Sequence, residues 1–240
     1  MQGTNLAESG PPFRRDIGLS DRQLWLRRRL GWLSEDKLLG LAKVGKIERI
    51  RARTTINVGR DIVRFVMRGA VRLQYAADER NTTVISIAGP GDLITKLFFK
   101  DAPKVSVQAM GNCTLLSLPR KPFLEAVIGI SGAELDRAVY LLFGGALDLL
   151  ARYWSTQGGP LMVRLAAVLL ELGRKFGFAD ARGTLVDLRL TQKDLARMIG
   201  CSRQQLHALL ENLEQRSMVQ RQGRQLILDL QELRRLARKA

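Results

Sequence analysis

The side chains best suited to recognition chemistry lie close together near the C-terminus: Arg203, Gln204, Gln205 and His207. Guanidinium, amide and imidazole groups hydrogen-bond to base edges and to phosphates. They follow Ser202, a residue type that favours the N-terminal cap of a helix, so they occupy the start of that helix. Polar groups in this position can read the major groove of a DNA duplex. The alternative is an ordinary polar helix face exposed to solvent.

Two short helices are predicted around these side chains, over residues 190–213. Thr191 and Asp194 have the types and spacing of a capping box at the start of the first helix. Gly200 is suited to ending that helix, because a residue in the left-handed conformation is best without a Cβ. A stripe of leucines gives the second helix a buried face. The pair therefore predicts a helix-turn-helix.

A basic hairpin is predicted directly after this helix pair, over residues 216–228, with its turn at Gly223. Arg224 places a cation beside that turn. A helix pair followed by a basic hairpin is a winged helix-turn-helix, and we assign it to residues 158–240. Its start is marked by two glycines and Pro160, a residue type favoured at the first position of a helix.

A small β-roll is predicted in the first half of the chain, over residues 34–130. Short runs rich in β-branched residues alternate with turns between residues 45 and 118, and a short helical connector follows at 119–130. Residues 1–33 form an N-terminal extension. In this extension we expect a helix that is capped by Ser20 and packs on the roll; the alternative is an amphipathic arm that binds a partner or a membrane.

A long helix is predicted between the two parts, over residues 131–157. Its apolar residues repeat in steps of four and three, which indicates a coiled-coil seam. We expect a homodimer interface, because a second apolar set that includes Ala138 and Leu141 can face the roll of the same chain. The alternative is a core helix within one subunit. The seam residues are Leu135, Val139, Leu142, Ala146, Leu149 and Tyr153.

The charge of the chain favours a polyanionic partner. The 240 residues include 39 Lys and Arg against 23 Asp and Glu, a net charge of +16, and the excess lies in both halves. We expect a cytoplasmic protein without membrane contact, because no segment approaches the length of an apolar span and the N-terminus lacks a signal-peptide core. With two cysteines, Cys113 and Cys201, the chain has too few thiols for an iron–sulfur or zinc site, so no cofactor or metal is expected.

In this order of elements the chain resembles the Crp/FNR family of bacterial transcription regulators, from about residue 34 to residue 237. The resemblance implies an α+β fold with a cyclic-nucleotide-binding-like roll, a dimerisation helix and a winged helix-turn-helix. It also implies a homodimer on a two-fold operator, with double-stranded DNA and RNA polymerase as partners. The matching segments are 59–61, the turn at Gly69, 87–94, 132–154, 163–172, 190–206 and 226–237.

The resemblance also implies roles for individual residues. Arg203 falls on the arginine that reads guanine, where its two-pronged guanidinium is worth about 1–3 kcal/mol of discrimination. Gln204 stands where the family usually has glutamate, and Ala208 where it has arginine, so we predict a half-site different from TGTGA or TTGAT. We assign base reading to Arg203, Gln204 and His207. We assign contact with the DNA backbone to Thr191, Ser202, Gln205 and Arg224.

The sensor region departs from the pattern of the cyclic-AMP binders. Their Gly-Glu-Leu run is Thr95-Lys96-Leu97 here, and their phosphate-binding Arg-Ser or Arg-Thr pair falls near Pro103-Lys104. Because an ammonium group cannot replace the ribose-binding carboxylate, we predict a regulator that does not respond to cyclic AMP and needs no effector. The alternatives are an unidentified anionic ligand held by Lys96 and Lys104, or a redox switch at Cys201. In the plainer interpretation these lysines are surface residues and the cysteine is a small buried filler.

Two other classes of protein compete with this interpretation. The sequence shows no carboxylate pair, nucleophile–histidine arrangement or Gly-rich phosphate loop, so we expect no enzyme. A winged helix can also bind protein. Salt dependence separates a winged helix that binds DNA from one that binds protein. In DNA binding, each neutralised phosphate lowers the logarithm of affinity by about 0.9 per decade of salt.

Overall fold

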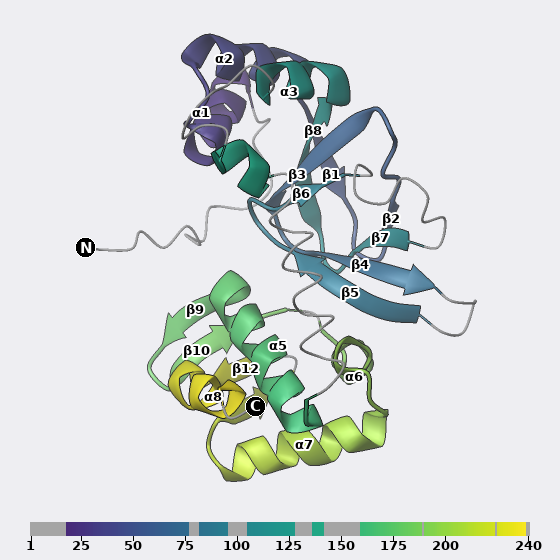
Figure 1. Ribbon diagram of the computed structural model, residues 1–240, viewed down its shortest axis with the longest axis vertical. Coiled ribbons are helices and arrows are strands. Elements are labelled where there is room, and N and C mark those ends of the chain that lie inside the picture. Colours follow the sequence, from purple (N-terminus) through teal and green to yellow (C-terminus); the bar gives the residue numbers. More distant parts are fainter. Residues whose placement is uncertain are drawn as a thin grey trace.

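The computed structural model describes residues 18–76, 82–95, 105–127, 136–141, 159–188, 190–223 and 225–238. It consists of a β-roll with helices on one face, and of a C-terminal domain of helices around a small sheet (Figure 1). This α+β architecture confirms the predicted fold class. Within the described ranges, no helix combines the length and apolarity needed to cross a membrane.

The roll is built from two antiparallel four-stranded sheets, with strand orders β1-β8-β3-β6 and β2-β7-β4-β5. The predicted β-rich runs all contain strands, whereas the two-residue strand β6 was not predicted because it is too short to show a period. The strands are β1 (Lys46–Ile50), β2 (Thr55–Ile56), β3 (Ile62–Arg68), β4 (Val71–Ala76), β5 (Thr82–Ala88), β6 (Leu93–Ile94), β7 (Val105–Ala109) and β8 (Cys113–Pro119).

Side-chain alternation along β3 separates two apolar cores of the roll. Phe65 belongs to a cluster under the helices, and its neighbour Val66 to the cluster that also contains Leu115. Gly69 then turns the chain from β3 to β4 with φ +81°. A Cβ at this glycine would lie 2.8 Å from Cys113 Cβ, so the close approach of the two backbones requires glycine.

Three helices cover one face of the roll: α1 (Leu19–Leu30), α2 (Glu35–Val44) and α3 (Arg120–Val127). Leu26 and Leu30 of α1 are fully buried in the same cluster as Phe65 and Phe123. This packing confirms the prediction that the N-terminal helix lies on the roll. The predicted cap at Ser20 was wrong: the helix begins two residues earlier, after Gly18, whose N–H donates to the Asp21 carboxylate at 3.1 Å.

Residues 136–141 are helical and belong to the predicted long helix. Ala138 is buried and Leu141 packs against the core under the roll helices, as the second apolar set predicted. Val139 points the other way and is 47% exposed. Several predicted site residues lie outside the described ranges: Lys96, Lys104, Leu135, Leu142, Ala146, Leu149, Tyr153 and Arg224.

The C-terminal domain places four helices around an antiparallel sheet of order β11-β12-β10-β9. Strand β10 ends at Val186, and β9 was not predicted because its sequence, GFAD, has no apolar alternation. The elements are α5 (Leu161–Phe176), β9 (Gly177–Asp180), β10 (Gly183–Val186), α6 (Gln192–Ile199), α7 (Arg203–Gln215), β11 (Val219–Gln222), β12 (Gln225–Leu228) and α8 (Leu230–Ala237).

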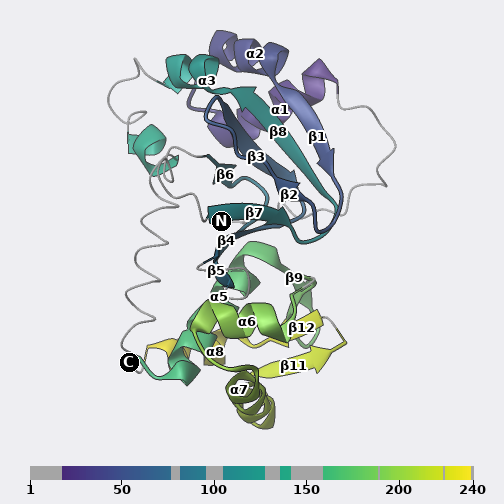
Figure 2. The same ribbon diagram turned by 90° about the vertical axis from the view of Figure 1, so that its right-hand side faces the viewer.

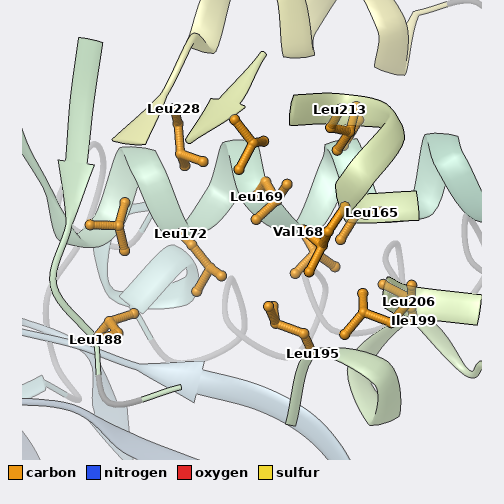
Figure 3. Close-up of a cluster of buried hydrophobic side chains, with 14 of the residues drawn as sticks. Leu165, Val168, Leu169, Leu172, Leu188, Leu195, Ile199, Leu206, Leu213 and Leu228 are labelled. Carbon is orange, nitrogen blue, oxygen red and sulfur yellow. The ribbon is translucent and has the colours of Figure 1, made fainter. Parts of the chain in front are cut away.

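The core of this domain forms around α5. Figure 3 shows Leu195 and Ile199 of α6 beside Val168 and Leu165 of α5, with Leu206 of α7 next to them. All five side chains are at most 5% exposed. At the transfer value of roughly 25 cal/mol per Å² of buried apolar surface, such a cluster contributes about 1.5–3 kcal/mol for each large side chain. The helix pair is therefore held as a rigid body on α5.

Candidate nucleic-acid interface

The N-terminus of α6 is fixed by a capping box, as predicted. The Thr191 Oγ1 accepts the Asp194 N–H at 3.1 Å, and the Asp194 carboxylate accepts the Thr191 N–H, also at 3.1 Å. The same carboxylate accepts the Thr191 hydroxyl proton at 2.8 Å. Thr191 is exposed, but its hydroxyl proton is engaged within the cap.

The turn between α6 and α7 is tight because of Gly200, which has φ +69°. Arg164 of α5 binds the residue before this turn. Its Nη1 donates to the Ile199 carbonyl at 3.2 Å and its Nε to the Gly159 carbonyl at 3.0 Å. The guanidinium thus satisfies a carbonyl at the C-terminal end of α6, where a positive charge is also favoured by the helix dipole. These contacts hold the C-terminal end of α6 against the beginning of α5.

The helix α7 presents its polar side to solvent. Ser202 caps it, with its Oγ accepting the Gln205 N–H at 3.1 Å and its own N–H donating to the Gln205 Oε1 at 3.0 Å. The residues of the first two turns that point away from the core are all exposed: Arg203, Gln204, Gln205, His207 and Ala208. The structure therefore brings the predicted base-reading side chains together on one accessible face.

His207 has a neighbour that sequence reasoning did not use. Its Nδ1 lies 3.4 Å from the Glu211 Oε1, one helical turn away, and both side chains are half-exposed. The i,i+4 spacing of the two residues is a visible signal for this contact. Within α7, Arg203 is the one arginine or lysine, so the positive charge of this helix lies at its N-terminal end.

The wing is tied to the end of α7 by an ion pair. Arg221 of β11 donates from Nε to the Glu214 Oε1 at 2.7 Å and from Nη2 to the Glu214 Oε2 at 2.5 Å. The Arg221 side chain therefore serves the positioning of the hairpin. The Arg221 guanidinium lowers the pKa of the Glu214 carboxyl below its usual value, mainly through this hydrogen bond. Gly223, with φ +61°, makes the turn of the wing.

Cys201 lies in the turn, between Gly200 and the cap of α7, and is partly buried. Burial raises the pKa of its thiol above the usual value, although a hydrogen bond from the Leu206 backbone and the charge of Arg164 act in the opposite direction. Since the thiolate is the reactive form, the raised pKa makes this cysteine a poor nucleophile at neutral pH. Its side chain packs against the core of the C-terminal domain.

The sequence of this domain matches a family model, and most of the chain is similar in sequence to a bacterial regulator. The model of the Crp-like helix-turn-helix domain matches residues 163–236. A CRP-like cAMP-activated global transcriptional regulator of Mycobacterium tuberculosis is 24% identical over 192 residues, which cover 75% of this chain and 80% of the relative.

Solved structures share the fold over most of the chain. The CooA mutant from Carboxydothermus hydrogenoformans is 25% identical, with a TM-score of 0.62 over 81% of this chain and 88% of that one. FixK2 from Bradyrhizobium japonicum is 22% identical, with a TM-score of 0.66 over 80% of this chain and 97% of that one. The matched domain and the relatives agree: the chain carries a Crp-like helix-turn-helix domain over residues 163–236, and over most of its length it is similar to transcription regulators of the Crp/FNR type.

Proposed function

We propose that the protein is a homodimer that binds a two-fold DNA operator through α7 and that it regulates transcription without cyclic AMP. The observation that carries this proposal is the exposed N-terminal face of α7, where Arg203 and Gln204 stand on a helix whose opposite face is fully buried. A rigid helix with its N-terminal side chains free is what major-groove reading requires. The net charge of +16 supplies the attraction to the phosphate backbone.

Within this proposal the polar residues divide into two roles. Arg203 reads guanine O6 and N7, Gln204 reads adenine N6 and N7, and His207 reaches a base edge further along the groove. Gln205 and Ser202 hold the DNA backbone. The Ser202 hydroxyl accepts within the cap but keeps its proton for a phosphate, and the Gln205 amide nitrogen takes no part in the cap.

We also propose that Thr191 and Arg224 contact the DNA backbone, on weaker observations than those for Ser202 and Gln205. Thr191 is exposed at the start of α6, but its hydroxyl donates to Asp194, so a phosphate contact would compete with the cap. Arg224 is proposed from its position in the sequence at the wing turn. Of the backbone contacts proposed, Ser202 and Gln205 are those best supported by geometry.

The dimer is proposed from the exposed face of residues 136–141. Val139 is 47% exposed and Tyr140 is 73% exposed, while Ala138 between the helix and the roll is buried. An apolar residue and an aromatic ring on the side opposite the roll suit a partner helix. A dimer also matches the two half-sites that a helix-turn-helix protein usually binds.

Two alternative hypotheses compete with the proposal that the protein needs no effector. The first is a small anion held by Lys96 and Lys104, which would act through the roll. Oxidation of Cys201 is the weaker competitor, because burial raises the pKa of its thiol. RNA polymerase is proposed as a protein partner, and the cytoplasm as the site of action, because both follow from regulating transcription in a bacterial cell.

The test is selection of random duplexes by the purified protein at near-physiological salt, without added nucleotide. We expect a two-fold motif with half-sites about one helical turn apart and different from TGTGA and TTGAT. A steep fall of affinity with salt should accompany it. Enrichment that appears only after a small anion is added would favour the anion-gated competitor. Absence of duplex binding at low salt would contradict the proposal and favour a protein-binding winged helix.

A further inference from the structure

Two ion pairs join the roll to the C-terminal domain. Arg72 of β4 donates from Nη1 to the Asp194 Oδ1 at 2.5 Å, and Lys175 of α5 donates to the Asp92 Oδ2 at 2.9 Å. The Asp194 side chain is only 6% exposed and the other three are between 22% and 30% exposed. Pairs shielded to this degree are weakened less by salt than surface pairs.

Apolar contact surrounds these ion pairs. Ala70, Val84 and Ile87 of the roll lie in one buried cluster with Leu195 and Ile199 of α6. Both views show β4 and β5 directly above α5 and α6 (Figures 1 and 2). The two domains therefore share a continuous core at this contact.

The helix α5 approaches the roll closely at Gly89. A Cβ on this residue would lie 2.4 Å from Phe176 Cε1, so a larger residue would displace the aromatic ring of Phe176 from the turn 89–92. The same turn carries Asp92. The contact of Lys175 with Asp92 and the contact of Phe176 with Gly89 thus come from neighbouring residues at the end of α5.

Each ion pair is held by further contacts on its own side. The Arg72 Nε also donates to the Gln108 Oε1 of β7 at 3.0 Å, and Asp194 is the residue that completes the cap of α6. Asp92 accepts the Gly89 N–H at 2.9 Å, and the neighbouring Gly91 carbonyl accepts the Arg29 Nε of α1 at 2.7 Å. Preorganised partners lose less side-chain entropy when the pair forms, so the pairs are stronger than isolated surface contacts.

We propose that the pairs Arg72–Asp194 and Lys175–Asp92 form a two-point clamp that sets the orientation of the reading helix α7 relative to the roll. Apolar contacts tolerate small rotations of one domain against the other, whereas two separated ion pairs with directional hydrogen bonds oppose such a rotation. α7 lies on the side of the C-terminal domain away from the roll (Figure 1). In the proposed dimer, joined through the segment 131–157 that the sequence predicts to be helical, this orientation determines the spacing of the two reading helices.

The clamp rests on the proposed binding of a homodimer to a two-fold operator, and it makes Arg72 and Lys175 positioning residues that need not touch DNA. The first test uses the duplex selected by the unmodified protein and a second duplex that keeps only one half-site. Arg72→Gln with Lys175→Gln should lower affinity for the two-fold duplex by about tenfold or more, the effect of losing a charge-assisted hydrogen bond. The affinity for the single half-site should fall no more than it does in a control variant that loses the same charge elsewhere on the roll.

The control is Arg28→Gln combined with Lys121→Gln, which removes the same charge from α1 and α3, where both residues are exposed. It corrects for the general loss of attraction to phosphates. An equal loss of affinity for both duplexes after this correction would overturn the clamp.

Asp194→Asn is the second variant: it removes the charge that faces Arg72 but keeps an oxygen for the cap of α6. In a double-mutant cycle, Arg72→Gln added to Asp194→Asn should lower the affinity for the two-fold duplex little further. Additive losses of affinity would show that the two side chains do not act as a pair.

A second measurement needs no DNA, so it separates failure of the clamp from failure of the proposed function. Spin labels are placed on cysteines introduced at Lys121 of α3 and Gln231 of α8, both exposed, in a Cys201→Ser background. Cys113 is fully buried. The labelled chain is diluted with unlabelled protein, and the distance distribution is measured by pulsed electron paramagnetic resonance. The clamp predicts one narrow distance that broadens in the Arg72→Gln, Lys175→Gln variant. An unchanged distribution would overturn it, whatever the protein binds.

Discussion

Arg221 and Glu214 join the wing to the reading helix through two hydrogen bonds, Nε to Oε1 at 2.7 Å and Nη2 to Oε2 at 2.5 Å. The Arg221 N–H donates to the same carboxylate at 3.2 Å. The pair thus takes an arginine that would otherwise be available to phosphates and uses it to fix the hairpin. It also leaves a measurable pH signature.

Glu214→Gln should destabilise the C-terminal domain at neutral pH by about 1 kcal/mol, the upper range for a partly exposed ion pair. The pKa of Glu214 is lowered in the folded protein from its usual value of 4.5, so the pair stabilises the fold fully above that value. The contribution is lost as the pH falls through the lower, folded-state pKa. Denaturant unfolding at pH 7 and at pH 3 measures it. The difference in unfolding free energy between wild type and Glu214→Gln should shrink at pH 3; an equal difference at both values would contradict the pairing.

Arg203→Lys tests the base-reading role. Lysine keeps the charge but loses the planar fork, so discrimination at one base pair should fall by about 1–3 kcal/mol while total affinity falls less. Binding to duplexes that differ only at that base pair measures the change. The comparison variant is Lys193→Ala, which removes an exposed cation of α6. This change should weaken all duplexes alike and reduce the salt slope by about 0.9. If Arg203→Lys weakened binding to all these duplexes equally, Arg203 would contact phosphate and not a base edge.

Local signals were sufficient to predict the helix-turn-helix. Thr191, Asp194, Gly200 and Ser202 act within a few residues of themselves, and their caps and turn appear as predicted. The N-terminal cap at Ser20 failed because a glycine with a carboxylate three residues later competes for the same role.

Contacts between distant residues left little trace in the sequence. Arg72 and Asp194 are 122 positions apart, and neither has a neighbour that would indicate the other. Strand β9 forms because β10 offers an edge beside the end of α5, not because its own residues favour a strand. The i,i+4 spacing of His207 and Glu211, by contrast, was readable from the sequence.

Cys201 should react slowly with iodoacetamide at neutral pH, and its reaction rate should rise as the pH approaches and passes the raised pKa of the thiol. Burial is the main cause of the raised pKa. Cys113, whose pKa is raised to about 11 by burial, should react only after unfolding. Mass spectrometry of the alkylated protein distinguishes the two sites. We also expect Cys201→Ser to bind the selected duplex with wild-type affinity. Fast modification at pH 7 together with loss of DNA binding would instead support a redox switch.

Val139→Glu should convert the protein to a monomer. Val139 is 47% exposed on the side of its helix away from the buried Ala138, so the substitution leaves the roll intact but places a charge in the proposed dimer seam. Sedimentation velocity measures the oligomeric state. The matched control is Leu24→Glu on α1, which is 49% exposed and far from the seam in sequence. The monomer should keep its affinity for a single half-site and lose the additional affinity for the two-fold duplex, because linking two binding events raises their combined strength. A Val139→Glu protein that stays dimeric would place the interface elsewhere on the chain.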